Sequence, residues 1–163
     1  MGGGKTASMR LANSADLERV VALTDAAYGG YVPLLGGPPL PMTEDYAPRI
    51  DRGEIWLMEN AGELDGLIVL ERHADHCMIF SVAVAPAAQG KGCGVALLDF
   101  AAQKARAWKS LEIRLYTNAR MERNIAIYER YGFCETGRRA NPHREGWMIV
   151  DMAKSVAASG RGL

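Results

Sequence analysis

The chain has 163 residues, of which 48% are hydrophobic and 23% are charged, which is the usage of an ordinary globular domain. Lys and Arg together number 19, as do Asp and Glu, so no net charge draws the whole molecule to nucleic acid or to an anionic membrane. No apolar run is long enough to cross a bilayer, and the first residues lack the apolar segment of a secretion signal. We therefore expect one cytoplasmic domain over residues 8–153, with flexible tails at residues 1–7 and 154–163.

The charges are unevenly distributed along the chain. Residues 1–88 hold 6 Lys and Arg against 12 Asp and Glu, whereas residues 89–163 hold 13 against 7. Either these charges lie on solvated faces without further meaning, or the second half handles an anionic ligand and the first half a cationic or neutral one. Cys77, Cys93 and Cys134 form no Cys-x-x-Cys pair, which predicts free thiols rather than disulfides or a zinc knuckle.

The first 51 residues predict an edge strand and two helices joined by a long loop. Residues 8–11 form the strand, and Asn13 or Ser14 caps the helix after it, because a short side-chain oxygen accepts from the free amides of a first turn. Helical spacing predicts that this helix buries a face made of Leu17, Val20, Val21, Thr24 and Ala27. Residues 28–41 are dense in Gly and Pro and predict a functional or mobile loop without regular structure, and residues 43–51 predict a short helix.

From residue 54 the pattern changes to strands. Residues 55–58 and 64–70 predict a hairpin, and residues 78–84 predict a third strand. A helix with one apolar face follows at residues 95–108, then a strand at 113–116 and a helix at 119–131 that ends at Gly132 in a left-handed cap. Residues 133–137 and 147–152 predict a last hairpin. This order predicts an α+β domain around a mixed sheet, in which a right-handed crossover joins two parallel strands.

The segment Gln89-Gly90-Lys91-Gly92-Cys93-Gly94 is the most informative stretch, because it follows a strand and opens a helix. There the backbone amides point outward, the helix dipole adds positive charge, and glycines let the backbone approach a ligand closely. The turn therefore suits a phosphate or a pyrophosphate. It does not fit the dinucleotide fingerprint G-x-G-x-x-G, and Gly4-Lys5-Thr6 lacks the first glycine and the strand of a Walker loop.

Gln89, Gly92 and Gly94 do fill the pattern Q/R-x-x-G-x-G/A, and two further elements accompany it. Val82-Ala83-Val84-Ala85-Pro86 precedes the turn, and Leu115-Tyr116-Thr117-Asn118 followed by Asn124-Ile125-Ala126-Ile127-Tyr128-Glu129-Arg130-Tyr131-Gly132-Phe133 comes after it. With these motifs the sequence resembles the GNAT superfamily of acetyl-CoA-dependent N-acetyltransferases over roughly residues 8–153. The resemblance implies a mixed sheet of six to seven strands, splayed between the fourth and fifth and flanked by helices.

The resemblance also assigns residues to acetyl-CoA, the implied co-substrate. The pantetheine arm pairs with the backbone of Val82, Ala83 and Val84, and the pyrophosphate lies on the amides of Gln89, Gly90, Lys91, Gly92, Cys93, Gly94 and Val95. Tyr128 occupies the place of the tyrosine that protonates the leaving thiolate, although it can also be a core tyrosine. Many relatives carry Asn at the position of Met121 and Ala at the position of Asn124. Asn124 is therefore our candidate for the cofactor contact of this helix. Cys93 is expected only to fill the turn, and Lys91, Arg120 and Arg123 to be solvated or to meet phosphate.

The implied reaction is the direct attack of a neutral amine on the acetyl thioester. An amine with a pKa of about 10 is mostly protonated at neutral pH, so a base or a water chain must take its proton. Relatives often place a carboxylate on the strand before the glycine turn, but residues 77–82 contain none. Glu71 is our candidate general base, with a water chain or a merely solvated Glu71 as the alternatives. A backbone amide of residues 82–84 is expected to polarise the thioester carbonyl.

Two groups of residues are candidates for binding the acceptor, and both can also be solvated surface. Aromatic and acidic groups, which suit a cationic amine, lie in or beside the Gly/Pro-rich segment, at Tyr28, Tyr31, Glu44, Asp45 and Tyr46. Basic groups, which suit a carboxylate or a phosphate, lie in the final hairpin, at Arg138, Arg139, His143 and Arg144. His73 and His76 share one turn, but without further ligands we expect no metal site.

We therefore expect an N-acetyltransferase that acts on a small-molecule amine, without a nucleic-acid or membrane partner and with a homodimer allowed. Two alternatives stay open: acetylation of a protein N-terminus or lysine, and a non-catalytic module that senses acyl-CoA. A peptide acceptor needs an open groove, whereas residues 28–41 are long enough to cover a small site. The missing strand carboxylate favours the sensor, and Tyr128 argues against it.

Overall fold

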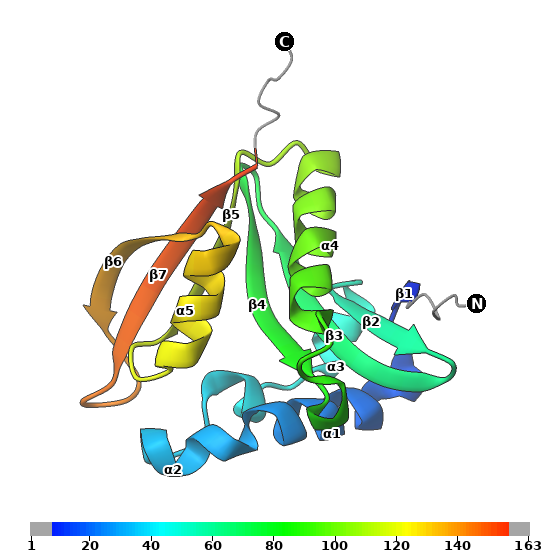
Figure 1. The fold of residues 1–163 in the computed structure, drawn as a ribbon, viewed down its shortest axis with the longest axis horizontal. Helices are drawn as coiled ribbons and strands as arrows, with labels where there is room; N and C mark the ends of the chain where they lie inside the picture. The colour runs from blue at the N-terminus through cyan, green and yellow to red at the C-terminus, as the bar shows by residue number, and fades with distance from the viewer. Residues whose placement is uncertain (1–7, 157–163) are drawn as a thin grey trace. The chain divides into compact units, whose positions relative to one another are not determined.

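A computed structural model describes residues 8–156, so the tail at residues 1–7, the Gly4-Lys5-Thr6 match and residues 157–163 lie outside the described part. Seven strands form one sheet in the order β1-β2-β3-β4-β5-β7-β6 (Figure 1). The strands are β1 (Ser8–Leu11), β2 (Ile55–Asn60), β3 (Glu63–Arg72), β4 (His76–Val84), β5 (Glu112–Asn118), β6 (Cys134–Ala140) and β7 (Met148–Ser155). The α-helices are α1 (Leu17–Tyr28), α2 (Val32–Leu35), α3 (Ala47–Asp51), α4 (Cys93–Ala107) and α5 (Glu122–Tyr131).

The sheet is mixed, as the order of the elements predicts. β4 and β5 run parallel through four residue pairs, from His76↔Glu112 to Ile79↔Leu115. The pairs β1–β2, β2–β3, β5–β7 and β6–β7 are antiparallel. The α+β class, the edge position of the first strand and the two hairpins are therefore confirmed, while the splay between the fourth and fifth strands stays a prediction.

The contacts group the chain into two compact units. The first unit holds residues 8–70 and 81–99, and the second holds residues 71–80 and 100–156. β2 and β3 supply much of the core of the first unit, with fully buried Ile55, Leu57, Leu67, Ile68 and Val69. In the second unit the buried apolar side chains include Cys77, Ala101, Ala105, Ile113, Val150 and Met152.

Asn13 caps a 3-10 turn (Ser14–Asp16) that leads directly into α1, so the predicted cap lies one turn before the α-helix. The Asn13 side chain accepts a hydrogen bond from the Ala15 amide at 2.9 Å, and the Asp16 carboxylate accepts from the Asn13 amide at 2.8 Å, which makes a reciprocal capping box. The buried face of α1 differs from the predicted one: Leu23 and Tyr28 are buried, whereas Val21 is exposed. The prediction for Val21 was wrong, because burial depends on which side of the helix packs against the rest of the unit. That side includes the polar Thr24 and, one turn later, Tyr28.

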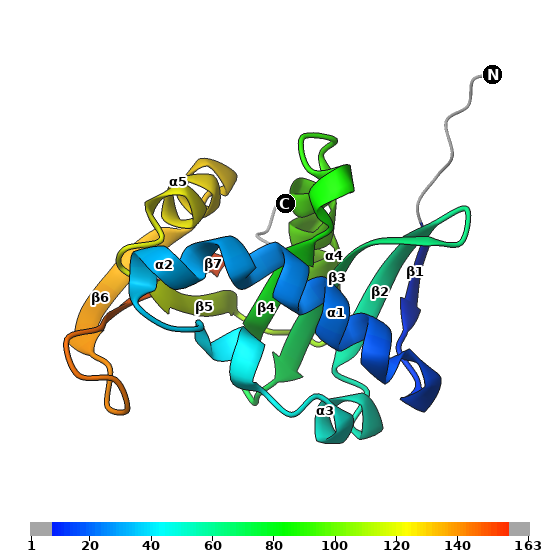
Figure 2. The same ribbon diagram turned by 90° about the horizontal axis from the view of Figure 1, so that it is seen from below.

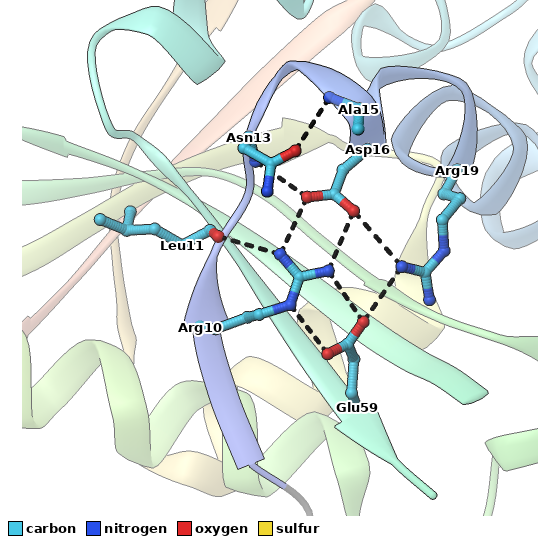
Figure 3. A network of polar contacts seen from close by, with 7 residues as sticks. All are labelled: Arg10, Leu11, Asn13, Ala15, Asp16, Arg19 and Glu59. Atoms are coloured by element: carbon cyan, nitrogen blue, oxygen red, sulfur yellow. Dashed lines mark hydrogen bonds and ion pairs between the residues drawn. The ribbon is translucent and has the colours of Figure 1, made fainter. Parts of the chain in front are cut away.

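Four charged side chains join β1, β2 and α1, and we call them the ion network: Arg10, Asp16, Arg19 and Glu59 (Figure 3). The Arg10 guanidinium donates to both oxygens of Asp16 at 2.9 Å, and to both oxygens of Glu59 at 2.9 and 3.0 Å. Arg19 donates to Asp16 at 3.3 Å and to Glu59 at 3.0 Å. The hydrogen bonds from Arg10 lower the pKa of Asp16 to about 2.

Residues 28–41 are largely helical, so the prediction of a loop without regular structure was wrong. After α1 the chain forms a 3-10 turn (Gly29–Tyr31), then α2, and later a second 3-10 turn (Leu40–Thr43). Pro33 lies in the first turn of α2, where its missing N–H costs no helical hydrogen bond, and α2 ends at Gly36. Leu35 is buried and ties the segment to the core. Gly and Pro here mark the ends of short helices rather than preventing them.

The last helix of the second unit ends after Tyr131 as the sequence predicts, but it begins at Glu122 rather than at Ala119, because the amides of Arg120 and Met121 donate to Asn118 in a turn. Gly132 follows α5 with a φ of +122°, and the amides of Gly132 and Phe133 both donate to the Tyr128 carbonyl. Phe133 is buried beneath this cap. β7 continues to Ser155, two residues past the end we expected for the domain, and Val156 after it is also buried.

No helix in residues 8–156 is both long and apolar enough to span a membrane. The three cysteines carry free thiols, with Cys77 buried, Cys93 half-buried and Cys134 exposed.

Candidate functional site

The glycine turn (residues 89–95) leads from β4 into α4, a helix of 15 residues. Gly90 and Gly92 have φ values of +80° and +82°, a region that glycine enters without steric cost. Residues with positive and negative φ therefore alternate in this turn. Such a backbone turns successive amides to the same side, where they can surround an anion. Among the described residues, no protein group accepts a hydrogen bond from the amides of residues 90–95. Together with the positive end of the α4 dipole, these amides make the turn a candidate anion site of main-chain donors.

The turn also has room for a ligand. A Cβ built on Gly90, Gly92 or Gly94 would have no atom within 4 Å, so the bare backbone faces open space. Cys93 lies between two of these glycines, and burial, with the nearby Asp65 adding to it, raises the pKa of its thiol. A thiol held in its protonated form is a poor nucleophile, which agrees with a role that only fills the turn.

Helix α4 lies directly against β3 below the turn. At Gly66 on β3, a Cβ would come within 3.0 Å of the Ala83 carbonyl oxygen and of the Leu97 side chain. Leu97 belongs to the second turn of α4 and is fully buried. The absence of a side chain at Gly66 therefore allows the close approach that holds the start of α4 against the strands.

The last residues of β4 present their backbone to two different edges. The Ala85 amide donates to the Asp65 carbonyl on β3 at 2.8 Å, and the Ala83 carbonyl also lies against β3 at Gly66. Because backbone groups alternate between the two edges of a strand, Val82 and Val84 direct theirs to the edge opposite β3. The residue pairs that join β4 to β5 end at Ile79, three residues before Val82.

Helix α1 runs across β4, and Tyr28 in its last turn contacts this edge (Figure 2). The Tyr28 hydroxyl donates to the Val82 carbonyl at 2.9 Å and lies 3.3 Å from the Ser81 hydroxyl. The Tyr46 hydroxyl donates to the Pro41 carbonyl at 2.6 Å. Both phenols are buried, and burial raises the pKa of each. Of the three tyrosines expected at the acceptor, only Tyr31 is half-buried rather than buried.

The acidic residues beside this segment are engaged with other groups. Glu44 accepts from the buried Arg49 at 2.6 Å, and Arg49 also donates to Glu54 at 2.9 Å. Asp45 is exposed, and its carboxylate accepts from the Ala47 amide at 3.2 Å. The sequence gives no sign of the Arg49 pairing, because a charged side chain in a short helix is ordinarily solvated.

In the second unit, α5 places Tyr128 and Asn124 on half-buried positions one turn apart. The Tyr128 ring lies edge-on to Phe133, with 5.8 Å between the ring centroids. Met121, just before the helix, is buried, and its sulfur accepts from the Thr117 hydroxyl. Asn124 therefore has the solvent-accessible surface that Met121 lacks, which agrees with Asn124 as the candidate contact.

Glu71 and the two histidines lie together in the second unit. Glu71 is 2.9 Å from His73 Nε2, Asp75 is 2.7 Å from His76 Nδ1, and the two imidazole rings stack at 4.6 Å. Burial raises the pKa of the neighbouring Cys77 thiol to about 12, and Glu71 adds to the rise. Within the described residues, no group of three or more His, Cys, Asp or Glu side chains is placed to hold a metal ion.

The arginines of the final hairpin are paired within the hairpin. Arg138 donates to both oxygens of Glu135, at 2.7 and 3.2 Å, and Arg139 donates to both oxygens of Asp151, at 2.8 and 3.0 Å. These carboxylates are partners that the sequence reasoning missed. Glu135 lies three residues before Arg138 and could have been noticed, whereas Asp151 comes from the next strand and carries no local signal.

Comparison with known families gives one match over the turn and its flanking elements. A family model described as an acetyltransferase (GNAT) domain matches residues 51–135, just over half of the chain. The match begins at the end of α3 and includes β2 to α5, so it contains the glycine turn, Tyr128 and Asn124.

Solved structures resemble this chain over nearly its whole length. The ribosomal-protein-S18-alanine N-acetyltransferase from Escherichia coli is 21% identical, with a TM-score of 0.75 over 97% of this chain and 99% of that one. The Salmonella typhimurium protein yncA with its cofactor acetyl-CoA is 19% identical, with a TM-score of 0.70 over 97% and 98%. Arabidopsis thaliana Naa50 in complex with the bisubstrate analogue CoA-Ac-MVNAL is 22% identical, with a TM-score of 0.71 over 92% and 99%. At these identities the likeness shows a shared fold.

Proposed function

Since the chain belongs to the GNAT family of acetyltransferases and depends on acetyl-CoA, we propose that it transfers the acetyl group to the primary amine of a small molecule. The observation that carries the proposal is the glycine turn, whose amides of residues 90–95 have no protein acceptor and face open space. A pyrophosphate supplies the oxygens that such a set of main-chain donors lacks.

We assign the pyrophosphate of coenzyme A to the backbone of the turn, at Gln89, Gly90, Lys91, Gly92, Cys93, Gly94 and Val95. The Gln89 amide already donates to the Pro86 carbonyl at 3.3 Å, so the amides of residues 90–95 are the ones open to the ligand. Val82, Ala83 and Val84 form the strand that receives the pantetheine arm, with the groups of Val82 and Val84 on the edge opposite β3. When bound, acetyl-CoA supplies an activated acyl group, and an amide of this strand polarises its carbonyl.

Tyr128 and Glu71, both in the second unit, are assigned to the two proton transfers. Tyr128 donates its phenolic proton to the departing thiolate, and Asn124 on the same helix face contacts the cofactor. The amine must lose a proton before or during its attack, and Glu71 is the candidate that takes it, directly or through water. Glu71 already lies 2.9 Å from His73, so a proton received there has a second acceptor within hydrogen-bond distance.

The segment between α1 and α3 supports the choice of a small, apolar acceptor. Residues 28–43 contain no charged side chain, and they expose Leu34 and Leu40 beside the half-buried Tyr31. An acceptor with an apolar body and one amine fits these groups, and Tyr31 is its expected contact. Arg138 was our candidate for an anionic group of the acceptor, but its pairing with Glu135 reduces the support for such a group.

A second candidate function is acetylation of a protein or peptide amine. Two of the structures with this fold are named for such acceptors, the Escherichia coli enzyme for an alanine of ribosomal protein S18 and the Arabidopsis thaliana one by its bisubstrate analogue. A third candidate, a non-catalytic acyl-CoA sensor, is motivated by the strand β4, which carries no carboxylate.

Thiol release from acetyl-CoA in the presence of an amine panel tests all three candidates. We expect turnover with small apolar amines and little with peptides or protein N-termini. Turnover confined to peptides would replace the small-molecule acceptor, and acetyl-CoA binding without turnover on any amine would favour the sensor. A chain that does not bind acetyl-CoA at all would contradict the assignment of the turn.

A further inference from the structure

Four buried hydroxyl groups gather in the first unit, on Thr24, Tyr28, Tyr46 and Ser81. None of these residues is more than 7% exposed. Thr24 and Tyr28 are four residues apart on α1 and so share a helix face. Burial raises the pKa of both phenols, and the Tyr28 phenol adds to the rise at Tyr46. Both tyrosines are therefore neutral hydrogen-bond donors at neutral pH.

Tyr28 differs from the other members of the cluster in its hydrogen-bond partners. Its single proton is committed to the Val82 carbonyl at 2.9 Å, so in the 3.3 Å contact with Ser81 the serine hydroxyl is the donor. The Tyr46 phenol instead donates to the Pro41 carbonyl, and the Thr24 hydroxyl lies close to this phenol. Tyr28 connects the α1 side of the cluster to the edge of β4 that the proposed function gives to the cofactor.

The Val82 carbonyl matters because of where it points. In a strand the N–H and the C=O of one residue face the same edge, so the carbonyl stands beside the amide of the same residue. An unpaired carbonyl oxygen at this edge would repel the negative charge that acyl transfer develops on the thioester oxygen. A hydrogen bond from Tyr28 reduces that repulsion, and it is already formed before any ligand binds.

We propose that Tyr28 is a positioning residue, which holds the Val82 carbonyl and thereby leaves the Val82 amide as the uncontested donor to the thioester oxygen. Tyr28 acts through Val82 and touches no reacting atom, and Ser81 keeps the phenol oriented by donating to its oxygen. The inference rests on the proposed function, because it requires acetyl-CoA at this edge of β4.

The chain offers a matched pair of variants for the test. Tyr28→Phe and Tyr46→Phe each remove one buried phenolic oxygen that donates to a backbone carbonyl, which is Val82 of β4 for Tyr28 and Pro41 for Tyr46. The main readout is the infrared carbonyl band of acetyl-CoA labelled with carbon-13 at the thioester carbonyl and bound to the full chain. For Tyr28→Phe we expect this band to move toward its position in solution, and for Tyr46→Phe we expect it to stay in place.

Steady-state kinetics give the second readout. Tyr28→Phe should lower kcat about tenfold, less than the loss of a directly bonded donor, and leave the KM for acetyl-CoA within about twofold. Tyr46→Phe should leave kcat and the KM for acetyl-CoA within about twofold, because a contact of Tyr46 with the acceptor would change the KM for the amine instead. Equal losses in the two variants, or an unmoved band in Tyr28→Phe, would overturn the inference.

Ser81→Ala provides a second test of the inference, which can be used if Tyr28→Phe fails to fold. It removes the donor to the Tyr28 oxygen without removing the bond to Val82, so we expect a shift of the band in the same direction and of smaller size. An unmoved band here contradicts the inference as well. If the wild-type chain binds no labelled acetyl-CoA, the proposed function fails too, whereas binding with a band that no variant moves contradicts only the role of Tyr28.

Discussion

The ion network and the glycine turn belong to the same unit and treat their polar groups in opposite ways. In the ion network, both carboxylates meet two guanidinium groups, and Arg10 alone makes four hydrogen bonds to them. In the glycine turn, the amides of residues 90–95 meet no protein acceptor among the described residues. The charges of the first region are satisfied within the protein, and the second keeps donors that the proposed function gives to a ligand. A change in the first should therefore reduce stability, and a change in the second should reduce binding.

The largest expected effect is from Gly92→Val. A side chain at a φ of +82° is strained, and a branched one also fills the open space over the turn. We expect acetyl-CoA affinity to fall at least about 100-fold, or about 2.7 kcal/mol, while circular dichroism keeps the folded spectrum. Isothermal titration calorimetry measures the affinity, and retained binding would remove the turn from the site.

Gly94→Ala is the matched control for that variant. Gly94 has no positive φ, and a Cβ there meets nothing within 4 Å, so the added methyl should not reduce the stability of the helix. We expect an unchanged or slightly higher melting temperature and a loss of acetyl-CoA affinity that is clearly smaller than for Gly92→Val. A large loss of stability in Gly94→Ala would show that the turn is occupied by protein rather than open.

Tyr128→Phe separates chemistry from binding. General acid catalysis contributes about 10²-fold or more, so we expect kcat to fall by about that factor while acetyl-CoA affinity changes little. The pH dependence of kcat should also lose the limb that belongs to the acid. Undiminished activity across the pH range would leave Tyr128 as the core tyrosine that its edge-on contact with Phe133 also allows.

Asp16→Asn tests the ion network. It leaves the buried position polar but removes the charge to which Arg10 and Arg19 donate. Since hydrogen bonds to charged groups are worth about 1.5–3 kcal/mol, we expect the free energy of unfolding to fall by about 2 kcal/mol. Urea denaturation measures this, and acetyl-CoA affinity should stay within about twofold. A loss of affinity without a loss of stability would reverse the comparison.

The pH dependence of stability is the smallest effect and has a defined sign. The pKa of Asp16 is lowered to about 2 in the folded chain, so between about pH 4 and pH 2 the unfolded chain takes up the proton first. Stability is therefore lost as the pH falls through this window. Because Arg10 and Arg19 are partly exposed, we expect about 1–2 kcal/mol from this group. In Asp16→Asn this part of the acid dependence should be missing.

Local features of the fold were predicted well from the sequence. The cap at Asn13, the end of α5 at Gly132 and the glycine turn before α4 each depend on residues within a few positions of one another. Such patterns are visible in a linear sequence, because the groups that satisfy one another are close in the chain.

Features that depend on distant partners were not predicted. Arg10 and Glu59 are 49 residues apart, Tyr28 and Val82 are 54 apart, and no local spacing links them. The same reason explains why Arg139 was taken as a ligand-binding group although it pairs with Asp151 of the next strand, whereas the partner of Arg138, Glu135, is only three residues away and was overlooked. In residues 28–41, Gly and Pro were interpreted as breaking structure where they set the ends of short helices.

The bare position at Gly66 has a mechanical consequence. A methyl group there would press on Leu97 and on the Ala83 carbonyl at 3.0 Å, and would act as a wedge under the first turns of α4. Tilting the helix would change the direction in which the amides at the start of α4 point. If the turn binds acetyl-CoA as proposed, its affinity then depends on Gly66, a β3 residue outside the turn.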